Sequence, residues 1–130
     1  MKVWKGHNLV PLVMREAMAS ILIGSAVTPT FEVKYMALGN DLTPPTNSDT
    51  TLGNETLRGL FTNRFAVDNV AYFDKFFSSA EVGGNTYLEA GMFVDGSGAA
   101  DSGYLISRVI INEAISATET LTFNCTITIS

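Results

Sequence analysis

The last ten residues alternate strictly between apolar and neutral polar side chains. One face carries Leu121, Phe123, Cys125, Ile127 and Ile129, and the other carries Thr122, Asn124, Thr126, Thr128 and Ser130. A period of two is typical of a half-buried β-strand. Free sheet edges are usually protected by lysine, proline or a bulge, and this segment has none of them. We therefore expect the strand to lie inside its sheet or its threonine face to be covered.

Residues 8–24 follow a helical period instead. The apolar positions on one face are Val10, Val13, Met14, Ala17, Met18 and Ile21. Asn8 is the predicted N-cap, Pro11 falls in the first turn, and Gly24 is the predicted stop. We expect this helix to lie across a sheet and cover the core. The alternative is a segment that packs on a partner.

Aromatic and β-branched residues predict six strands, and turn residues separate them. The predicted strands are residues 31–38, 64–70, 70–78, 87–94, 104–111 and 121–129. Residues 52–60 are predicted as a short helical turn. Short strands without alternating helices indicate a mainly β protein, an antiparallel and jelly-roll-like β-sandwich with one N-terminal α-helix. We expect one domain over 1–130, made of a basic arm (1–7), the helix (8–24) and the sandwich (31–130).

The chain is poor in charge. It is 46% hydrophobic and only 16% charged, against about 25% charged in ordinary domains, which suggests a surface shared with neighbours. Residues 1–34 carry four basic and two acidic side chains, whereas the remainder carries four basic and eleven acidic ones. A basic arm of this kind can dock on the acidic body of another copy, or it is an ordinary solvated terminus.

The same numbers argue against several partners. A net charge of −5 without a basic cluster disfavours nucleic acid. The apolar runs fall short of the ~20 residues that a bilayer crossing needs, so no membrane span is expected. Arg15 and Glu16 interrupt the apolar stretch near the N-terminus, which argues against a signal peptide.

The inventory of reactive side chains is small. One histidine, His7 in the arm, and one cysteine, Cys125 on an apolar strand face, cannot build a zinc site. Glu89 is either catalytic or a structural residue paired with Arg108. The loop over residues 95–102 has two carboxylates but lacks the spacing of a calcium loop, so we interpret it as a hairpin loop. We predict no catalytic residue, no cofactor and no metal, and therefore no enzyme.

Aromatic residues gather in one part of the chain. They are Tyr72, Phe73, Phe76, Phe77 and Tyr87. At strand spacing such a stripe is usually core. The alternative is a ligand-binding module in which these rings bind a glycan.

Three segments follow one another in a recognisable order. The first runs from Tyr35-Met36-Ala37-Leu38-Gly39 through a Thr/Pro/Asp loop to Asp49-Thr50-Thr51-Leu52. The second is the strand Glu89–Phe93, followed by a Gly/Ala loop and an aliphatic strand with Arg108, and the third is the closing threonine-rich strand. Together they resemble small virion structural proteins of tailed bacteriophages, described as tail-fibre, baseplate or capsid-associated proteins. The aromatic-dense segment Val70–Phe77 departs from that pattern.

The resemblance implies a non-enzymatic virion structural protein. We expect an auxiliary capsid cement or decoration protein on a repetitive lattice, where modest contacts repeat many times. Its expected partners are the major capsid or tail proteins and further copies of itself, with a trimer favoured. Its expected location is the virion, assembled in the host cytoplasm. The candidate interface residues are Lys2, Trp4, Lys5, Thr122, Asn124, Thr126 and Thr128.

The alternative within the virion is a structural module of a tail fibre or baseplate. Such a module could contact host-surface glycan through the loops at residues 43–54 and 95–103. Copy number distinguishes the two, because a cement protein occurs in hundreds of copies and a fibre protein in a handful.

Overall fold

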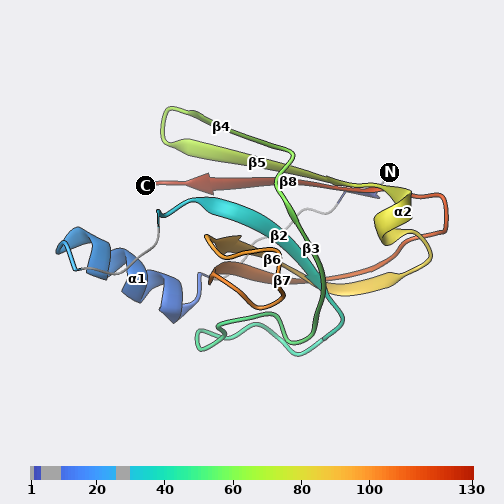
Figure 1. The fold of residues 1–130 in the computed structure, drawn as a ribbon, viewed down its shortest axis with the longest axis horizontal. Helices are drawn as coiled ribbons and strands as arrows, with labels where there is room; N and C mark the ends of the chain where they lie inside the picture. Colours follow the sequence, from blue (N-terminus) through green and yellow to red (C-terminus); the bar gives the residue numbers. More distant parts are fainter. Residues whose placement is uncertain (1, 4–9, 26–29) are drawn as a thin grey trace.

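The computed structural model describes residues 2–3, 10–25 and 30–130, and of residues 2–3 it describes the backbone (Figure 1). Eight strands and two helices follow one another along this part of the chain. They are β1 (Lys2–Val3), α1 (Leu12–Leu22), β2 (Val33–Gly39), β3 (Glu55–Leu60), β4 (Asn63–Val67), β5 (Val70–Phe77), α2 (Ser79–Val82), β6 (Thr86–Val94), β7 (Tyr104–Ala114) and β8 (Leu121–Thr128).

The strands form two sheets. Sheet A has the order β1-β8-β5-β4, and sheet B has the order β3-β2-β6-β7. Every neighbouring pair is antiparallel except β1 and β8, which run parallel over two residues. The expectation of a mainly β chain with antiparallel sheets and one N-terminal helix is confirmed.

The main core lies between the sheets. Its most deeply buried members come from both of them: Leu38, Phe77, Val94, Leu121 and Phe123. A second, smaller cluster lies on the opposite side of sheet B. It consists of Ala37, Leu52, Phe93 and Leu105. Leu52 comes from the long loop between β2 and β3, so this loop covers the outer face of sheet B.

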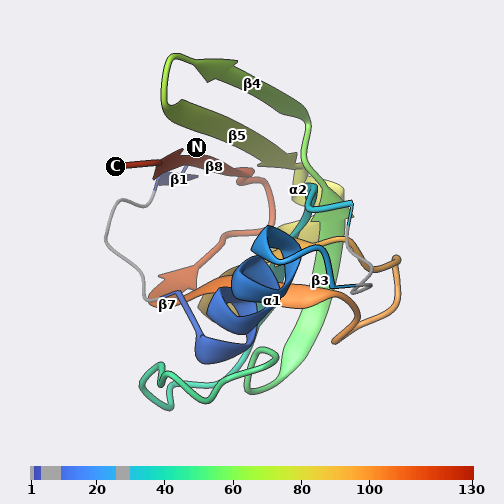
Figure 2. The same ribbon diagram turned by 90° about the vertical axis from the view of Figure 1, so that its left-hand side faces the viewer.

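Helix α1 packs at one end of the sandwich, next to the edge strand β7 (Figures 1 and 2). It begins after Pro11, an extended N-cap, whereas the predicted N-cap Asn8 lies outside the described residues. Only Met14 and Ala17 of the helix are buried. The buried face is thus narrower than predicted, because Met18 and Ile21 remain 41% and 38% exposed.

The expectation for residues 52–60 was wrong. Residues 55–60 form the strand β3 instead of a helical turn, because this segment pairs with β2 in the register Arg58↔Ala37. The closing strand β8 pairs with β5 along its length, but on its other edge β1 reaches only Leu121 and Thr122. In the strand order of sheet A, β8 lies between β1 and β5, so it is internal to its sheet as expected, although within the described residues β1 accompanies it over two residues.

The short helix α2 was missed, although the sequence contained its signal. Ser78 and Glu81 form a capping box, in which each side chain bonds to the other's backbone amide. Ser followed three residues later by Glu is the usual sequence signature of this motif.

Candidate functional site

The outward side of sheet A collects side chains from three adjacent strands. The register aligns Phe65 with Tyr72 and Tyr72 with Thr126, so these three residues lie in one row across the sheet. Side chains alternate between faces along a strand, and the alternate residues Phe73, Phe77 and Phe123 are in the core. The outer face of sheet A therefore consists of Asn63, Phe65, Val67, Val70, Tyr72, Asp74, Phe76, Thr122, Asn124, Thr126 and Thr128.

This face is exposed, apolar in part and almost uncharged. Phe65 and Phe76 are each 48% exposed and Val67 is 53% exposed. The rings of Phe65 and Tyr72 are stacked, with centroids 4.8 Å apart. Asp74 is the one charged residue of the face, and it accepts a hydrogen bond of 2.9 Å from Asn124 Nδ2. Exposed aromatic rings beside neutral polar groups are typical of protein interfaces.

The predicted interface residues divide into two groups. Asn124, Thr126 and Thr128 are exposed and Thr122 is half-buried, so the strand brings all four together on this face. The backbone of Lys2 lies beside Leu121 at the edge of the same sheet. The side chain of Lys2, and Trp4 and Lys5 altogether, lie outside what the structure describes.

Sequence reasoning missed the aromatic part of this face. The alternation in VAYFDKFF contains the signal, because it places Tyr72, Asp74 and Phe76 on one side of β5 and Phe73 and Phe77 on the other. Phe73, Phe77 and Tyr87 are buried, as expected for core residues, while Tyr72 is half-buried and Phe76 is exposed. The expected stripe is therefore partly core and partly surface.

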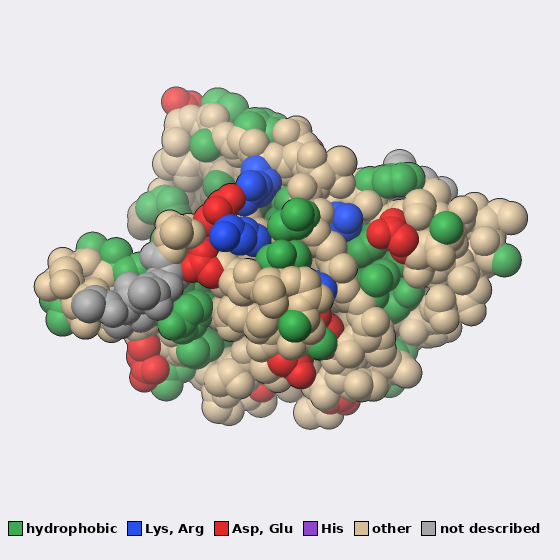
Figure 3. All heavy atoms as spheres, viewed as in Figure 1, with side chains coloured by type: hydrophobic (Ala, Val, Ile, Leu, Met, Phe, Trp, Pro, Cys, Tyr) green, Lys and Arg blue, Asp and Glu red, His purple; other side chains and the backbone are tan. Residues whose placement is uncertain are grey.

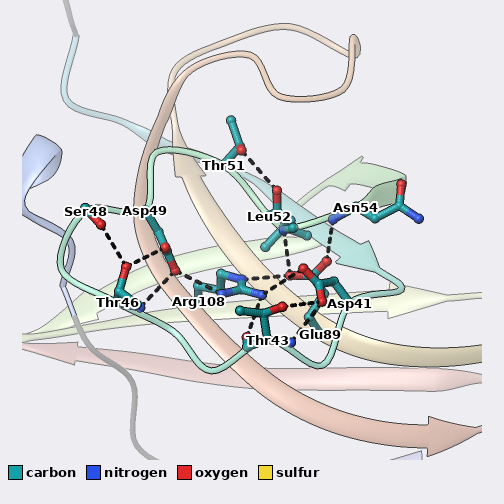
Figure 4. Close-up of polar contacts among 11 residues, drawn as sticks. Asp41, Thr43, Thr46, Ser48, Asp49, Thr51, Leu52, Asn54, Glu89 and Arg108 are labelled. Carbon is teal, nitrogen blue, oxygen red and sulfur yellow. Dashed lines mark hydrogen bonds and ion pairs between the residues drawn. The ribbon is translucent and has the colours of Figure 1, made fainter.

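On sheet B, a buried arginine fixes the long loop over residues 40–54 (Figure 4). Arg108 on β7 is 3% exposed and donates from Nε to Glu89 Oε2 at 2.7 Å, which confirms the expected structural pair. It also donates to Asp49 Oδ2 and to the carbonyl oxygen of Thr43, each at 2.9 Å. Burial would lower the pKa of Arg108, but the bonds to Glu89 and Asp49 outweigh it and raise the pKa.

The carboxylates around Arg108 are fully engaged. Glu89 accepts the backbone amides of Gly53 and Asn54 at 2.9 and 2.8 Å in addition to Arg108. Burial acts to raise the pKa of Asp49, yet hydrogen bonds from Thr46 and Arg108 hold it below its usual value. Both carboxylate oxygens of Glu89 thus accept hydrogen bonds, and through them Glu89 holds the loop on sheet B.

A second arginine fixes the loop over residues 95–103. Arg58 on β3 pairs with Glu55 and donates to the carbonyl oxygens of Ser97 and Ser102 at 3.1 and 3.0 Å. Its guanidinium lies over the ring of Phe93, 4.5 Å from the centroid. A guanidinium that stacks and bonds in this way is held in one orientation, so this loop is also fixed to sheet B.

Cys125 and His7 are the remaining side chains that could carry chemistry. Burial, and then the nearby Asp74, raises the pKa of Cys125 to about 11, which disfavours the reactive thiolate. His7 lies outside the described residues. Within the described ranges, no three side chains of the metal-binding types are grouped to hold an ion. None of the helices in these ranges combines the length and the apolar character that a bilayer crossing requires.

We compared the chain with known proteins in three ways. Neither the protein-family models, nor the curated proteins, nor the solved structures contain a match to it.

Proposed function

We propose that this chain is a non-enzymatic bacteriophage virion structural protein, an auxiliary capsid cement or decoration protein that attaches to a repetitive lattice. The observation that carries the proposal is the outer face of sheet A, where exposed Phe65 and Phe76 adjoin the threonines of β8 with Asp74 as the one charge. Covering such a face removes apolar surface from water without burying unpaired charges. Many weak copies of this contact add up on a lattice.

The motifs that resemble virion proteins support the proposal from a different direction. Asp49 of the first motif segment meets Glu89 and Arg108 of the second in one hydrogen-bond network. Two motif glycines also belong to it, because a Cβ on Gly91 would meet Leu52 at 2.7 Å and one on Gly39 would overlap Glu89. The first two motif segments therefore describe one structural unit, the fixation of a loop on sheet B, whereas the third is the strand β8 of sheet A.

The proposed partners follow from this arrangement. They are the major capsid or tail proteins of the particle and further copies of the chain, and the proposed location is the virion. A jelly-roll-like connection of the sandwich is part of the proposal, and it rests on the pattern of short strands in the sequence. A lattice-bound subunit gains affinity from being preorganised, and the two arginine-fixed loops supply that rigidity.

The second candidate is a module of a tail fibre or baseplate. One observation favours it: the loops over residues 40–54 and 95–103 are held on the same sheet, with Glu55 Oε2 accepting the amide of Asp101 at 3.0 Å. Adjacent, fixed loops rich in hydroxyl and carboxylate groups form a surface suited to hydrogen bonding with a glycan.

Copy number in purified particles tests the proposal and separates the two candidates. Quantitative mass spectrometry of washed particles, referenced to the major capsid protein, is expected to find hundreds of copies of the chain. A handful of copies favours the fibre or baseplate module. Washed particles that contain no copy of the chain, although the culture produces it, contradict a virion role of either kind.

A further inference from the structure

A polar row crosses the outer face of sheet A. The register aligns Asn63 of β4 with Asp74 of β5, and Asp74 with Asn124 of β8. Side chains directly opposite each other on one face of an antiparallel sheet are close neighbours, so the two asparagines flank the carboxylate. Asn124 Nδ2 donates to Asp74 Oδ1 at 2.9 Å. Among the described residues, no hydrogen bond or ion pair reaches Asp74 Oδ2.

Aromatic rings flank the same carboxylate along its own strand. Tyr72 and Phe76 stand two positions before and after Asp74, so the three side chains point to one face at intervals of about 7 Å. The ring of Tyr72 is held by its stack with Phe65, and Phe76 is 48% exposed. Asp74 is therefore a half-buried carboxylate with rings on two sides and carboxamides on the other two.

The chain supplies no cation to Asp74 within the residues that are described. Four basic side chains form ion pairs there, all with other carboxylates: Lys34, Arg58, Arg64 and Arg108. Figure 3 shows blue side chains gathered next to red ones below the β4–β5 hairpin. Lys75 follows Asp74 along β5 but points to the inner face, where its Nζ lies over the ring of Phe77. A molecule that covers Asp74 must therefore bring the cation itself, because an unpaired buried carboxylate is costly.

The surroundings of Asp74 suit a guanidinium better than an ammonium group. Arginine is planar, presents five N–H donors in a fixed fork and stacks on aromatic faces, whereas lysine is a compact and strongly hydrated charge. One guanidinium can donate to Asp74 Oδ2 and to the side-chain oxygen of the exposed Asn63. Its plane can lie against the ring of Phe76 at the same time.

We propose that the lattice protein inserts an arginine side chain at Asp74, between the rings of Tyr72 and Phe76. This inference rests on the proposed function, and it names the type of residue that the partner contributes. Arginine and tyrosine are typical of the central contacts that dominate the affinity of an interface, surrounded by neutral groups that exclude water. Asp74 thus selects a partner that carries a cation and rejects one that carries a carboxylate at this point.

Binding of the full chain to particles stripped of it tests the pairing. Asp74→Asn keeps the size of the side chain and an acceptor for Asn124, so normal folding is expected. The variant is expected to bind at least ~10-fold more weakly than the wild type, because it removes the charge. Glu16→Gln is the control, since it removes one negative charge from an exposed position on α1, and it is expected to bind as the wild type does. Equal affinities of Asp74→Asn and the wild type overturn the inference.

Modification of the particles identifies the residue type of the partner. Stripped particles are treated either with a dicarbonyl reagent specific for arginine or with a reagent that acetylates lysine. Arginine modification is expected to weaken binding of the wild type at least ~10-fold. It is expected to weaken binding of Asp74→Asn much less, because that variant has already lost the pair. Equal losses for the two chains overturn the inference, and so does a loss of binding after lysine acetylation alone.

The outcomes separate this inference from the proposed function. Binding that is lost in Thr126→Glu but unchanged in Asp74→Asn supports the lattice contact and contradicts the arginine alone. A wild-type chain that does not bind the particles contradicts both.

Discussion

Arg108 and Glu89 form a buried ion pair, with Nε and Oε2 2.7 Å apart, on the outer side of sheet B (Figure 4). The two side chains are 3% and 0% exposed. A buried pair of this kind is stable only when further hydrogen bonds satisfy both partners. Here the long loop supplies them, because Gly53 and Asn54 donate to Glu89 and Asp49 accepts from Arg108.

Removing the arginine tests that interdependence. Arg108→Met leaves the carboxylate of Glu89 buried without its cation, which is expected to lower the free energy of unfolding by about 3–5 kcal/mol. Denaturant titration of both proteins measures the difference. Arg15→Met is the control, because Arg15 is exposed on α1, and it is expected to change stability by less than about 0.5 kcal/mol. Equal effects of the two substitutions would show that the network contributes nothing.

The close approach of the loop to the sheet is tested at Gly91. A Cβ there would lie 2.7 Å from Leu52 Cδ2 and 2.8 Å from the carbonyl oxygen of Ser107. Gly91→Ala is therefore expected to destabilise the fold by about 1–3 kcal/mol through overpacking. Gly98→Ala provides the comparison, since a Cβ on Gly98 meets nothing within 4 Å. Thermal unfolding that fails to separate the two variants is evidence against tight packing of this loop.

The carboxylates of the loop predict a loss of stability in acid. Hydrogen bonds from Thr46 and Arg108 outweigh burial and lower the pKa of Asp49, and the Thr43 amide and hydroxyl lower that of Asp41. A carboxyl group whose pKa is lower in the folded state stabilises the fold fully above its unfolded pKa, here 3.8. That stabilisation is lost as the pH falls through the folded value.

The corresponding measurement compares wild type with Asp49→Asn in unfolding titrations at a series of pH values. The wild type is expected to be the more stable protein at neutral pH, and the gap is expected to narrow below about pH 4. A gap that is the same at pH 7 and pH 3 contradicts the lowered pKa.

Cys125 is expected to react slowly in the folded protein. Burial is the chief cause that raises its pKa to about 11 from an ordinary value of 9.0. The two-unit difference makes the native thiolate about 100-fold scarcer at neutral pH. Labelling with a thiol reagent is therefore expected to be at least that much slower in buffer than in denaturant. By the same shift, the contribution of Cys125 to stability is constant below about pH 9 and is lost as the pH rises towards 11. Native-state labelling at the denatured rate refutes the assignment.

The strands were the most predictable part of the fold, and individual residues show why. The period of two in the last ten residues separates Phe123, in the core, from the exposed Asn124. Burial of one face of a strand places an apolar residue at every second position, and that alternation is visible in the sequence. Residues 55–60 lack such an alternation of apolar and polar residues. Gly59 lies in the strand, with Lys75 Nζ of the facing sheet 2.7 Å from the position of a Cβ, and sequence alone cannot distinguish a glycine in a strand from a glycine in a turn.

Helix α1 and the hydrogen-bond network around Arg108 show two other limits of prediction from the sequence. An amphipathic period identifies Met18 and Ile21 as apolar-face residues, but it cannot say whether the core or another molecule covers them. The pair of Glu89 with Arg108 was predictable, since a buried carboxylate in a strand needs a partner. The participation of Asp49 was not, because it depends on the path of a loop that only tertiary contacts determine.

The central claim is that the outer face of sheet A attaches the chain to a virion lattice, and a binding measurement tests it most directly. Purified chain is added to particles stripped of it, and the bound copies per particle are counted after co-sedimentation. The wild type, and the control Thr118→Glu in the exposed turn before β8, are expected to saturate at hundreds of copies. Thr126→Glu is expected to fold normally and bind at least ~10-fold more weakly, because it places a charge in the contact. A Thr126→Glu chain that coats the particles as the wild type does, or a wild-type chain that does not bind them, contradicts the claim.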